Sequence, residues 1–507
     1  TSMQDALLDS RGGQLVVGFG AAGAGVAGSY AATGYTPAFL VSPIERFLAR
    51  TMPGAVVTVA IETLGSLGQQ LNLLTAVVLA WVLLAACATG AVLAGRAANN
   101  RVLPALGTGV VTWAVTAGLT GELALSLGPA LPAAGVVALA QVVDSYRGRA
   151  EPISSRRRRA LSTVGLAVGA TAVGFELGER RTARNNEALE LSAPGADLTD
   201  INAKLSIARD RALDVDGIEP LVSEEFFQVD INSIDPDVTA DDWTLTVTGE
   251  VEQEVTVGYD DIREMEAVNQ FSTLRCVGDS LNGQKMDTAL WTGVPLQDLV
   301  DEAGPQSDCE CVLLRSADGY EVEFPMEAFD RGLAVYGMNG NVLPRGHGYP
   351  VRAVIPGHWG EGNTKWLTEI EVLEREVDGY WEQRGWEGTG PVKPTATLHH
   401  DAMLDDGQRE LAGQAYGGLR GVSAVEVSTD GGSTWSTATL SEPLPAADGE
   451  GRAEDAWRQW RYTYTPPDRA HEVVVRMVDE DGTVQTDEET GPYPTGPSGW
   501  VSREFQR

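Results

Sequence analysis

Cys276 carries the side chain in this sequence that is best suited to binding a metal. It lies in the stretch Phe271-Ser-Thr-Leu-Arg-Cys-Val-Gly-Asp279, at the end of a strand-like run and two residues before a glycine. Among the four cysteines it is the one in a polar, loop-like setting. A thiolate there is a soft ligand for a soft or high-valent metal centre. A small buried core residue is the alternative for a lone cysteine, and the stretch alone leaves both interpretations open.

The other three cysteines do not offer a comparable ligand. Cys87 lies inside an apolar run. Cys309 and Cys311 lead into a predicted strand, where residues two apart face the same way and rarely form a good disulfide. A zinc site would need further Cys or His residues nearby, and the sequence has none there.

A second set of polar residues follows downstream of Cys276. Arg352 offers a planar fork for phosphate oxygens and Lys365 a compact charge. Lys365 is one of only four lysines among 37 basic residues, which favours a specific role. Buried structural ion pairs are the alternative for both cations. By itself, His347 would be a capping or surface residue.

Charge divides the chain into two segments. Residues 1–186 contain 14 Arg, no Lys and 9 acidic residues, a balance of +5, whereas the rest has a balance of −39. The first segment also has long uncharged runs, which predicts a membrane segment joined to a very acidic soluble one with room for two further domains. The acidity is dispersed and lysine-poor, as expected for a protein in concentrated salt, and we expect a halophilic archaeal source. No basic patch for nucleic acid lies outside the membrane loops, and the acidic residues form no block that would mark an acidic tail.

The apolar runs predict a transmembrane bundle of about five helices within residues 1–178. Residues 55–67 are better suited to an interfacial or re-entrant helix. Glu62 and Glu122 are intramembrane carboxylate candidates for a proton or quinone site, with helix ends as the alternative. The predicted spans are Leu15–Thr33, Leu73–Ala94, Ala105–Leu127, Ala133–Val143 with its flanks, and Leu161–Leu177.

Arginines in the loops predict the orientation of the bundle. Arg96 and Arg101 follow the second span, and an arginine-rich stretch follows the fourth, which places the N-terminus inside and the residues after the fifth span outside. The run Ser155-Arg-Arg-Arg-Arg-Ala-Leu-Ser162 fits positive-inside anchoring and also a twin-arginine export signal. The spans contain no histidine, so we expect no haem in this chain and a separate electron carrier or quinone as its redox partner.

Beyond the bundle, the pattern predicts a linker at 179–218, an α+β domain at 219–390 and an all-β sandwich at 391–507. The first domain mixes alternating strand patterns with short helical ones, and the second has only strands separated by Asp-Gly turns. The expected strands are Trp243–Gly249, Val312–Leu314, Glu321–Phe324, Val351–Ile355, Ala424–Ser428, Trp460–Thr465 and Glu472–Val478, and the expected helices are Tyr259–Ala267 and Leu296–Ala303.

Residues 219–507 resemble the sulfite oxidase family of mononuclear molybdenum enzymes. The most specific match is His347-Gly-Tyr-Pro-Val-Arg-Ala-Val-Ile-Pro-Gly357, followed by Asn363-Thr-Lys-Trp366. The sandwich is similar to the immunoglobulin-like dimerisation domain of that family, which implies a homodimer. Further matching segments, in order, are Phe226-Phe227, Trp243–Gly249, the Cys276 loop, Trp291–Asp298, Tyr336–Pro344, and Val425–Gly432 with Trp435.

The resemblance implies a molybdopterin cofactor and assigns roles to the residues above. Cys276 would bind molybdenum directly, beside the pterin dithiolene and oxo groups. The phosphate of molybdopterin matches the chemistry of Arg352 and Lys365. The implied cofactor-binding residues are Phe227, Cys276, Ser316, Asp318, His347, Arg352, Asn363, Thr364 and Lys365.

The chain departs from the family where sulfite would bind. Family members carry arginines where this chain has Gln228–Ile231 and Ser280-Leu281, and a tyrosine where it has Trp386. Loss of these cations weakens the attraction for a small dianion, so a neutral sulfoxide or N-oxide competes with sulfite as the substrate. Arg275, His358 and Trp359 could compensate for the missing arginines. By the resemblance, Trp291 and Trp386 would lie near the metal.

The sequence therefore predicts a membrane-anchored, outward-facing molybdopterin oxidoreductase that catalyses two-electron oxygen-atom transfer. The alternative is a non-catalytic extracellular binding or sensory module on the same fold. The retained Cys276, Arg352 and Lys365 argue for the enzyme.

Overall fold

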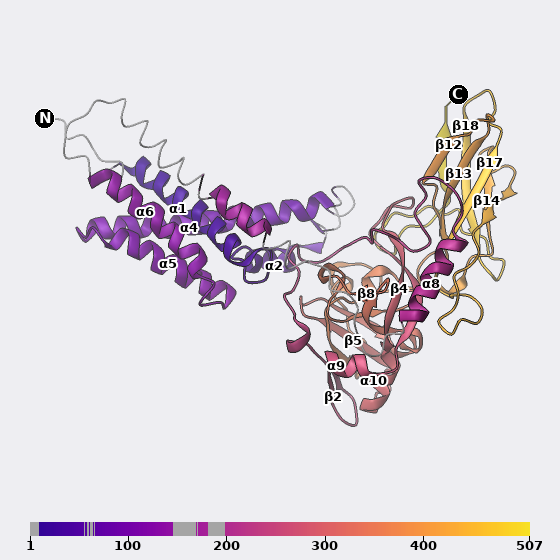
Figure 1. Ribbon diagram of the computed structural model, residues 1–507, viewed down its shortest axis with the longest axis horizontal. Helices are drawn as coiled ribbons and strands as arrows, with labels where there is room; N and C mark the ends of the chain where they lie inside the picture. The colour runs from indigo at the N-terminus through magenta and orange to yellow at the C-terminus, as the bar shows by residue number, and fades with distance from the viewer. Residues whose placement is uncertain are drawn as a thin grey trace. The chain divides into compact units, whose positions relative to one another are not determined.

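The computed structural model describes residues 10–145 apart from 55, 58, 59, 61–63 and 65, together with 169, 171–180 and 198–506. The chain forms two compact units, one helical and one rich in β-structure (Figure 1). The helical unit comprises Thr1–Met52, Leu64–Glu187 and Asp230–Asp237, and the β unit comprises Pro53–Thr63, Ala188–Val229 and Val238–Arg507.

The helical unit is built on long apolar helices. Ser10 caps the first helix by accepting a hydrogen bond from the Gly13 amide at 3.0 Å. Glycines let this helix pack closely on its neighbours: a Cβ on Gly28 would lie 2.3 Å from the Gly128 carbonyl oxygen. The helices are α1 (Arg11–Thr33), α2 (Ser42–Thr51), α4 (Ser66–Ala97), α5 (Leu103–Thr120) and α6 (Leu127–Ser145).

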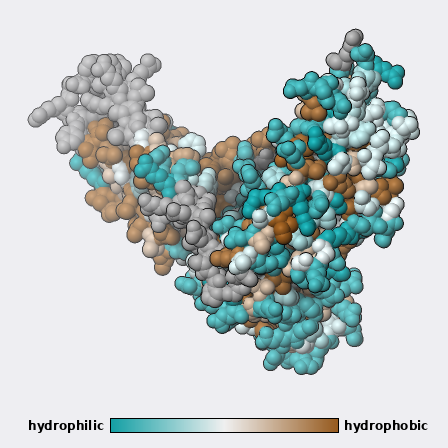
Figure 2. Space-filling view, turned by 45° about the vertical axis from the view of Figure 1, so that its right-hand side comes forward, coloured by the Kyte–Doolittle hydropathy of each residue, from teal (hydrophilic) through white to brown (hydrophobic). Residues whose placement is uncertain are grey.

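Three of the described helices are long and apolar enough to cross a membrane: Arg11–Thr33, Leu67–Ala97 and Leu103–Thr120. Leu127–Val143 is a shorter apolar helix. Brown, hydrophobic residues gather over this unit in Figure 2, whereas teal, hydrophilic residues dominate the β unit.

The predicted spans differ from the structure at several places. The third ends at Thr120 rather than Leu127, because Gly121 adopts a left-handed conformation and caps the helix. Glu122 therefore lies exposed just beyond a helix end. Most of the predicted fifth span, Glu62, several residues of the predicted interfacial helix and the arginine run lie outside the described residues.

Asp230–Asp237 follows the Phe226-Phe227 pair in sequence but packs within the helical unit. The Glu45 carboxylate of α2 is buried and accepts hydrogen bonds from the Asn72 side chain at 2.8 Å and the Ser233 amide at 3.2 Å. Ile234 is buried in a cluster that includes Tyr30 and Phe39. These contacts make Asp230–Asp237 part of the helical unit's core.

The first part of the β unit contains two sheets. One sheet has the order β3-β4-β7-β8, with β9 also paired to β7, and the other has the order β2-β1-β10-β5-β6. Only the β1–β10 pair is parallel among the described strand pairs of these sheets. The short helices α9 (Tyr259–Glu264) and α10 (Leu296–Ala303) accompany them. The strands are β1 (Thr244–Gly249), β2 (Val255–Gly258), β3 (Val268–Arg275), β4 (Met286–Pro295), β5 (Cys311–Ser316), β6 (Glu321–Pro325), β7 (Leu333–Met338), β8 (Asn341–Val342), β9 (Arg352–Val354) and β10 (Leu367–Val372).

The second part of the β unit has two sheets that share one core. Leu411 and Trp460 from one sheet pack with Val425 and Val473 from the other. The sheets have the orders β11-β13-β17-β16, with β12 on β13, and β15-β14-β18-β19. The strands are β11 (Thr395–Ala396), β12 (His400–Met403), β13 (Arg409–Tyr416), β14 (Ala424–Ser428), β15 (Ser436–Thr437), β16 (Thr439–Leu440), β17 (Arg458–Tyr464), β18 (His471–Val478) and β19 (Val501–Phe505).

A buried carboxylate joins the two parts of the β unit. Asp455 accepts a hydrogen bond from the Tyr416 hydroxyl of β13 at 2.6 Å and another from the Ser272 hydroxyl of β3. Its carbonyl accepts the Thr273 amide at 2.8 Å. The strand that ends at Cys276 is thus held by the C-terminal sheets.

The prediction that Cys309 and Cys311 do not bridge is wrong. The two cysteines form a disulfide, with Cα atoms 5.2 Å apart. Strand β5 begins only at Cys311, and Glu310 has a φ of 50°, so the chain turns between the two sulfur atoms instead of running straight.

Helix α8 (Leu198–Arg211) lies within the stretch predicted as a linker. The Leu213 amide just after it donates to the Gln459 side chain of β17 at 2.7 Å, and Arg211 contacts Glu442 at 3.8 Å. This end of the stretch is therefore packed against the C-terminal sheets.

Candidate molybdenum cofactor site

Cys276 follows directly after β3, at the start of a loop that its own backbone closes. Its amide donates to the Lys285 carbonyl at 2.9 Å, and Asp279 accepts the Lys285 amide at 2.6 Å. The residue as a whole is partly accessible to solvent, although its sulfur lies in a buried setting. Burial raises the pKa of Cys276 to about 11, and the charge of Lys285 opposes that rise. A coordinated metal would hold the sulfur as a thiolate regardless of this pKa.

His347, Arg352 and Lys365 form a compact group, which we call the cation cluster. Arg352 donates to the carbonyls of His347 at 3.2 Å and Asn363 at 2.7 Å, and Lys365 donates to the Gly346 carbonyl at 2.8 Å. Burial and the charges of Arg352 and Lys365 lower the pKa of His347 to about 3. The imidazole is thus neutral in a positive field, which suits an anion such as a phosphate.

The predicted loop residues Ser316, Asp318, Asn363 and Thr364 hold the backbone around this cluster. The Ser316 hydroxyl donates to the Lys365 carbonyl at 2.7 Å, and Asp318 accepts the Tyr320 amide at 2.8 Å. The Asn363 side chain is used inside its own loop, accepting the Ile355 amide at 2.7 Å. The buried Thr364 hydroxyl has no hydrogen-bond partner within the described residues.

Phe226, rather than Phe227, presents its ring to the cation cluster. The Phe226 ring lies edge-on to the rings of His347 and Trp291, with centroid distances of 5.7 Å and 5.4 Å. Phe227 stacks on Phe226, and its backbone amide donates to the Asp287 carboxylate at 2.7 Å. Trp291 is fully buried under Arg352, and its indole donates to the Ser272 carbonyl at 3.2 Å. Trp291 therefore supports Arg352 from the core of the sheet.

Arg275 and Trp386 are buried donors with unused capacity. One Arg275 nitrogen donates to the Lys393 carbonyl at 2.7 Å, but its Nη2 has no partner in the described part of the chain, and neither has the indole nitrogen of Trp386. Burial lowers the pKa of Arg275 to about 10, so its guanidinium stays charged. His358 makes a different set of contacts from this pair. Its Nδ1 forms a hydrogen bond with the Pro356 carbonyl at 3.0 Å, and its ring packs edge-on against Phe324.

A loop of the C-terminal part, Tyr493–Gly496, packs against these donors. The Tyr493 ring meets Trp386 edge-on at 5.4 Å, and Lys393 donates to the Thr495 hydroxyl at 2.7 Å. A Cβ on Gly496 would lie 2.3 Å from the ring of Trp359, which in turn lies 5.1 Å from the Arg275 guanidinium. The loop thus forms a wall next to Trp359 and Trp386.

Sequence reasoning missed three charged residues near Cys276. Lys285 and Glu361 both act electrostatically on the thiol, and Lys393 acts on Arg275. The scarcity of lysine was the available signal: Lys285, Lys365 and Lys393 act on Cys276, His347 and Arg275 respectively, whereas Lys204 pairs with Asp200 at 2.6 Å. Glu361 had no comparable signal in an acidic chain.

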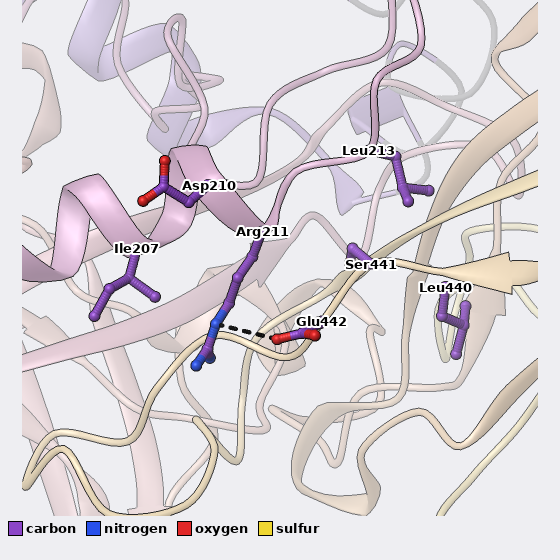
Figure 3. Close-up of a pocket in the computed structure, with 7 residues that line it drawn as sticks. All are labelled: Ile207, Asp210, Arg211, Leu213, Leu440, Ser441 and Glu442. Carbon is purple, nitrogen blue, oxygen red and sulfur yellow. Dashed lines mark ion pairs between the residues drawn. The ribbon is translucent and has the colours of Figure 1, made fainter.

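The cavity drawn in Figure 3, of about 470 Å³, is not this site. It lies between helix α8 and the strands around Leu440, and its charged lining is Asp210 and the Arg211–Glu442 ion pair. It contains no cysteine or histidine, and no predicted site residue lines it.

The residues present fit a molybdopterin. A soft thiol, a cation cluster for a phosphate, and buried N–H and O–H groups without acceptors at Arg275, Trp386 and Thr364 converge through connected loops. Among the described residues no group of three or more His, Cys, Asp and Glu forms an all-protein metal site. A metal here would therefore need ligands from the cofactor beside Cys276.

Comparison with known proteins finds two matching domains. Residues 232–381 match the oxidoreductase molybdopterin binding domain, and residues 391–491 match the Mo-co oxidoreductase dimerisation domain. Both domains are similar to those of sulfite oxidase-like molybdopterin oxidoreductases, which supports a molybdenum-dependent oxidoreductase. Molybdopterin is the cofactor of this oxidoreductase.

Several curated proteins are similar to part of this chain. The oxidoreductase is 30% identical over 306 residues to mitochondrial sulfite oxidase of Homo sapiens, covering 50% of this chain and 55% of the relative. It is 28% identical over 310 residues to nitrate reductase [NADH] of Solanum lycopersicum, covering 48% of this chain and 34% of the relative. The chain thus spans about half the length of the sulfite oxidase and about a third of the length of the nitrate reductase. The crystal structure of the sulfane dehydrogenase SoxCD of Paracoccus pantotrophus aligns with a TM-score of 0.44 and 18% identity, covering 59% of this chain and 86% of that one.

Proposed function

We propose that this chain is a membrane-anchored, outward-facing oxidoreductase that transfers an oxygen atom to or from a small sulfur or nitrogen oxo compound in a two-electron reaction. The observation that carries the proposal is the Nη2 atom of Arg275, a buried donor without an acceptor among the described residues, in the residue directly before Cys276. Trp386 Nε1 is a second such donor, and it is linked to Arg275 through the Tyr493–Gly496 loop and Trp359. Both would donate to a substrate oxygen.

The protein's own residues bind and orient the reactants. The cation cluster would hold the phosphate of the cofactor, with Ser316, Asp318 and Asn363 fixing the loops around it and the unpaired Thr364 hydroxyl free to bond the cofactor. Cys276 would be the protein ligand of the metal. When bound, the molybdenum cofactor supplies the two-electron oxygen exchange.

Arg275 would give the substrate site its charge. Its pKa and that of Lys393 are both lowered, first by burial, and for Lys393 also by the charge of Arg275. Two cations held close together attract an anion or the oxygen end of a strong dipole. Sulfite and a sulfoxide or N-oxide all present such an oxygen, and Trp386 would add an N–H donor where relatives carry a tyrosine.

The helical unit would anchor the enzyme, with its N-terminus inside and the β unit outside. Three long apolar helices and the arginines at the α4–α5 connection support this orientation. A separate electron carrier or quinone would reoxidise or reduce the site, and the C-terminal immunoglobulin-like sandwich would form a homodimer. Export by a twin-arginine route would suit a domain that folds around its cofactor.

Metal analysis and a substrate screen test the proposal together. The full chain, made in a molybdenum-replete host and purified at high salt, should contain close to one molybdenum per chain. It should turn over sulfite, methionine sulfoxide or an N-oxide with an artificial electron carrier. The non-catalytic binding or sensory module would instead show no bound molybdenum and no turnover of any of the three.

A further inference from the structure

The carboxyl group of Glu361 is enclosed by the loops that are proposed to bind the cofactor. The Tyr320 hydroxyl, two residues beyond Asp318, donates to the Glu361 carbonyl at 2.9 Å. A Cβ on the preceding Gly360 would lie 3.1 Å from the Arg275 carbonyl oxygen and 3.6 Å from the Cα of Cys276. Glu361 therefore sits between the metal-ligand loop and the Ser316–Tyr320 turn.

Both carboxyl oxygens of Glu361 are buried, and neither has a hydrogen-bond partner within the described residues. A carboxylate withdrawn from water without a donor costs considerable free energy. Burial first, and the charge of Glu382 second, raise the pKa of Glu361 to about 8. At neutral pH the protein alone thus holds this group mainly as the neutral acid, and N–H donors from a ligand would favour the carboxylate with its two acceptor oxygens.

The ring system of a pterin offers what these acceptors lack. It carries N–H and amino groups, and a carboxylate with two free oxygens can accept from two neighbouring donors at once, as carboxylates do from the edges of nucleic-acid bases. The cations of the site donate to backbone carbonyls, and no described residue donates a hydrogen bond to either carboxyl oxygen of Glu361.

We propose that Glu361 is a cofactor-recognition residue that accepts hydrogen bonds from the N–H groups of the bound pterin. This rests on the cofactor of the proposed function and adds a residue that the family resemblance did not supply. Hydrogen bonds to a charged group of this kind contribute about 1.5–3 kcal/mol, which corresponds to about tenfold or more in affinity.

The test compares Glu361→Gln with Glu374→Gln, which removes the same charge from an exposed position. Glutamine keeps the shape but points an amino group at the pterin donors. We expect Glu361→Gln to retain about tenfold less pterin after dialysis, measured by the fluorescence of the released, oxidised pterin and by molybdenum content. We expect the cofactor-free form, made in a host without the cofactor, to melt at a higher temperature than the wild type, because the unpaired carboxylate is gone.

The outcomes separate the explanations. Pterin retention equal to wild type overturns the inference, as does an equal loss in Glu374→Gln, which would mean that only net charge matters. A cofactor-free Glu361→Gln chain that melts at a lower temperature would show a purely structural role and would also overturn it. A wild type that contains no pterin at all refutes the proposed function instead, and this inference with it.

Discussion

Two parts of the cofactor site are built in opposite ways. The cation cluster of His347, Arg352 and Lys365 is satisfied from within, since its cations donate to backbone carbonyls of the same loops. Arg275, Trp386 and Glu361 instead bury polar atoms that have no partner among the described residues. We call these three the open group. In our proposals the cluster is formed before anything binds, whereas the open group would be completed only by cofactor and substrate.

The sharpest test of this difference is Cys276→Ser, next to the open group. We expect a loss of turnover of about a hundredfold or more, because the serine oxygen is a poor replacement for a soft thiolate ligand. Folding and pterin content should stay, since the cation cluster is untouched. Turnover and pterin content are measured on the same preparation, and unchanged turnover would refute the ligand assignment.

Breaking the cation cluster should affect folding as well as binding. Arg352→Met leaves several buried carbonyls without a donor, and we expect a loss of about 3 kcal/mol in stability together with loss of the cofactor. Arg352→Lys, which keeps the charge but not the fork, should recover only part of both. Thermal melting and molybdenum content report the two effects, and a variant that melts like the wild type would show that the cluster is not the stable element we describe.

Asp455 differs from the open group, because both of its carboxyl oxygens have hydrogen-bond partners although the group can still ionise. It therefore tests the effect of burying a charge without the effect of an unpaired polar atom. Burial raises its pKa to about 7, above the ordinary value of about 3.9 in the unfolded chain. Its contribution is therefore most favourable below pH 4 and is lost as pH rises through 7. Between pH 5 and 8 the wild type should lose about 2 kcal/mol relative to Asp455→Asn. Melting curves at these pH values check it, and parallel curves for the two chains would contradict it.

The smallest effect is expected at the wall next to the open group. Gly496→Ala pushes a methyl group into Trp359, whereas Gly482→Ala has nothing within 4 Å at nearly the same φ, +82° against +81°. Alanine has about the same cost in backbone conformation at both positions, so the difference between the two variants measures the effect of the contact with Trp359. We expect KM to rise about tenfold only for Gly496→Ala, with kcat and molybdenum content maintained. Equal KM values for the two variants would remove the loop from the substrate site.

Periodicity in the sequence was enough to locate several elements. The predicted segments Leu296–Ala303 and Ala424–Ser428 coincide with α10 and β14, because each has a clear pattern bounded by turn residues. The predicted helix at Tyr259–Ala267 ends earlier, at Glu264, where Met265 is already extended. The number of membrane spans was predicted from composition alone. Hydropathy extended the third predicted span to Leu127, whereas Gly121 ends helix α5 at Thr120.

The motifs led to Cys276, His347, Arg352 and Lys365 because these residues lie in distinctive local sequences. Glu361 and Lys393 could not be found in this way, since their significance comes from loops brought together by folding. The choice of Phe226 over Phe227 likewise depends on which neighbour faces His347. Cys309 and Cys311 show the same limit: the turn at Glu310 is a feature of backbone conformation that spacing does not reveal.

The packing of Asp230–Asp237 inside the helical unit has a practical consequence for preparing the enzyme. A fragment cut at the predicted domain start, Glu219, would carry this segment away from its partners. Ile234 would lose its apolar cluster and Ser233 its bond to Glu45. Such a fragment would expose the apolar side chain of Ile234, shortly after Phe226-Phe227 in the sequence. The chain with its helical unit is therefore the form in which to study this oxidoreductase.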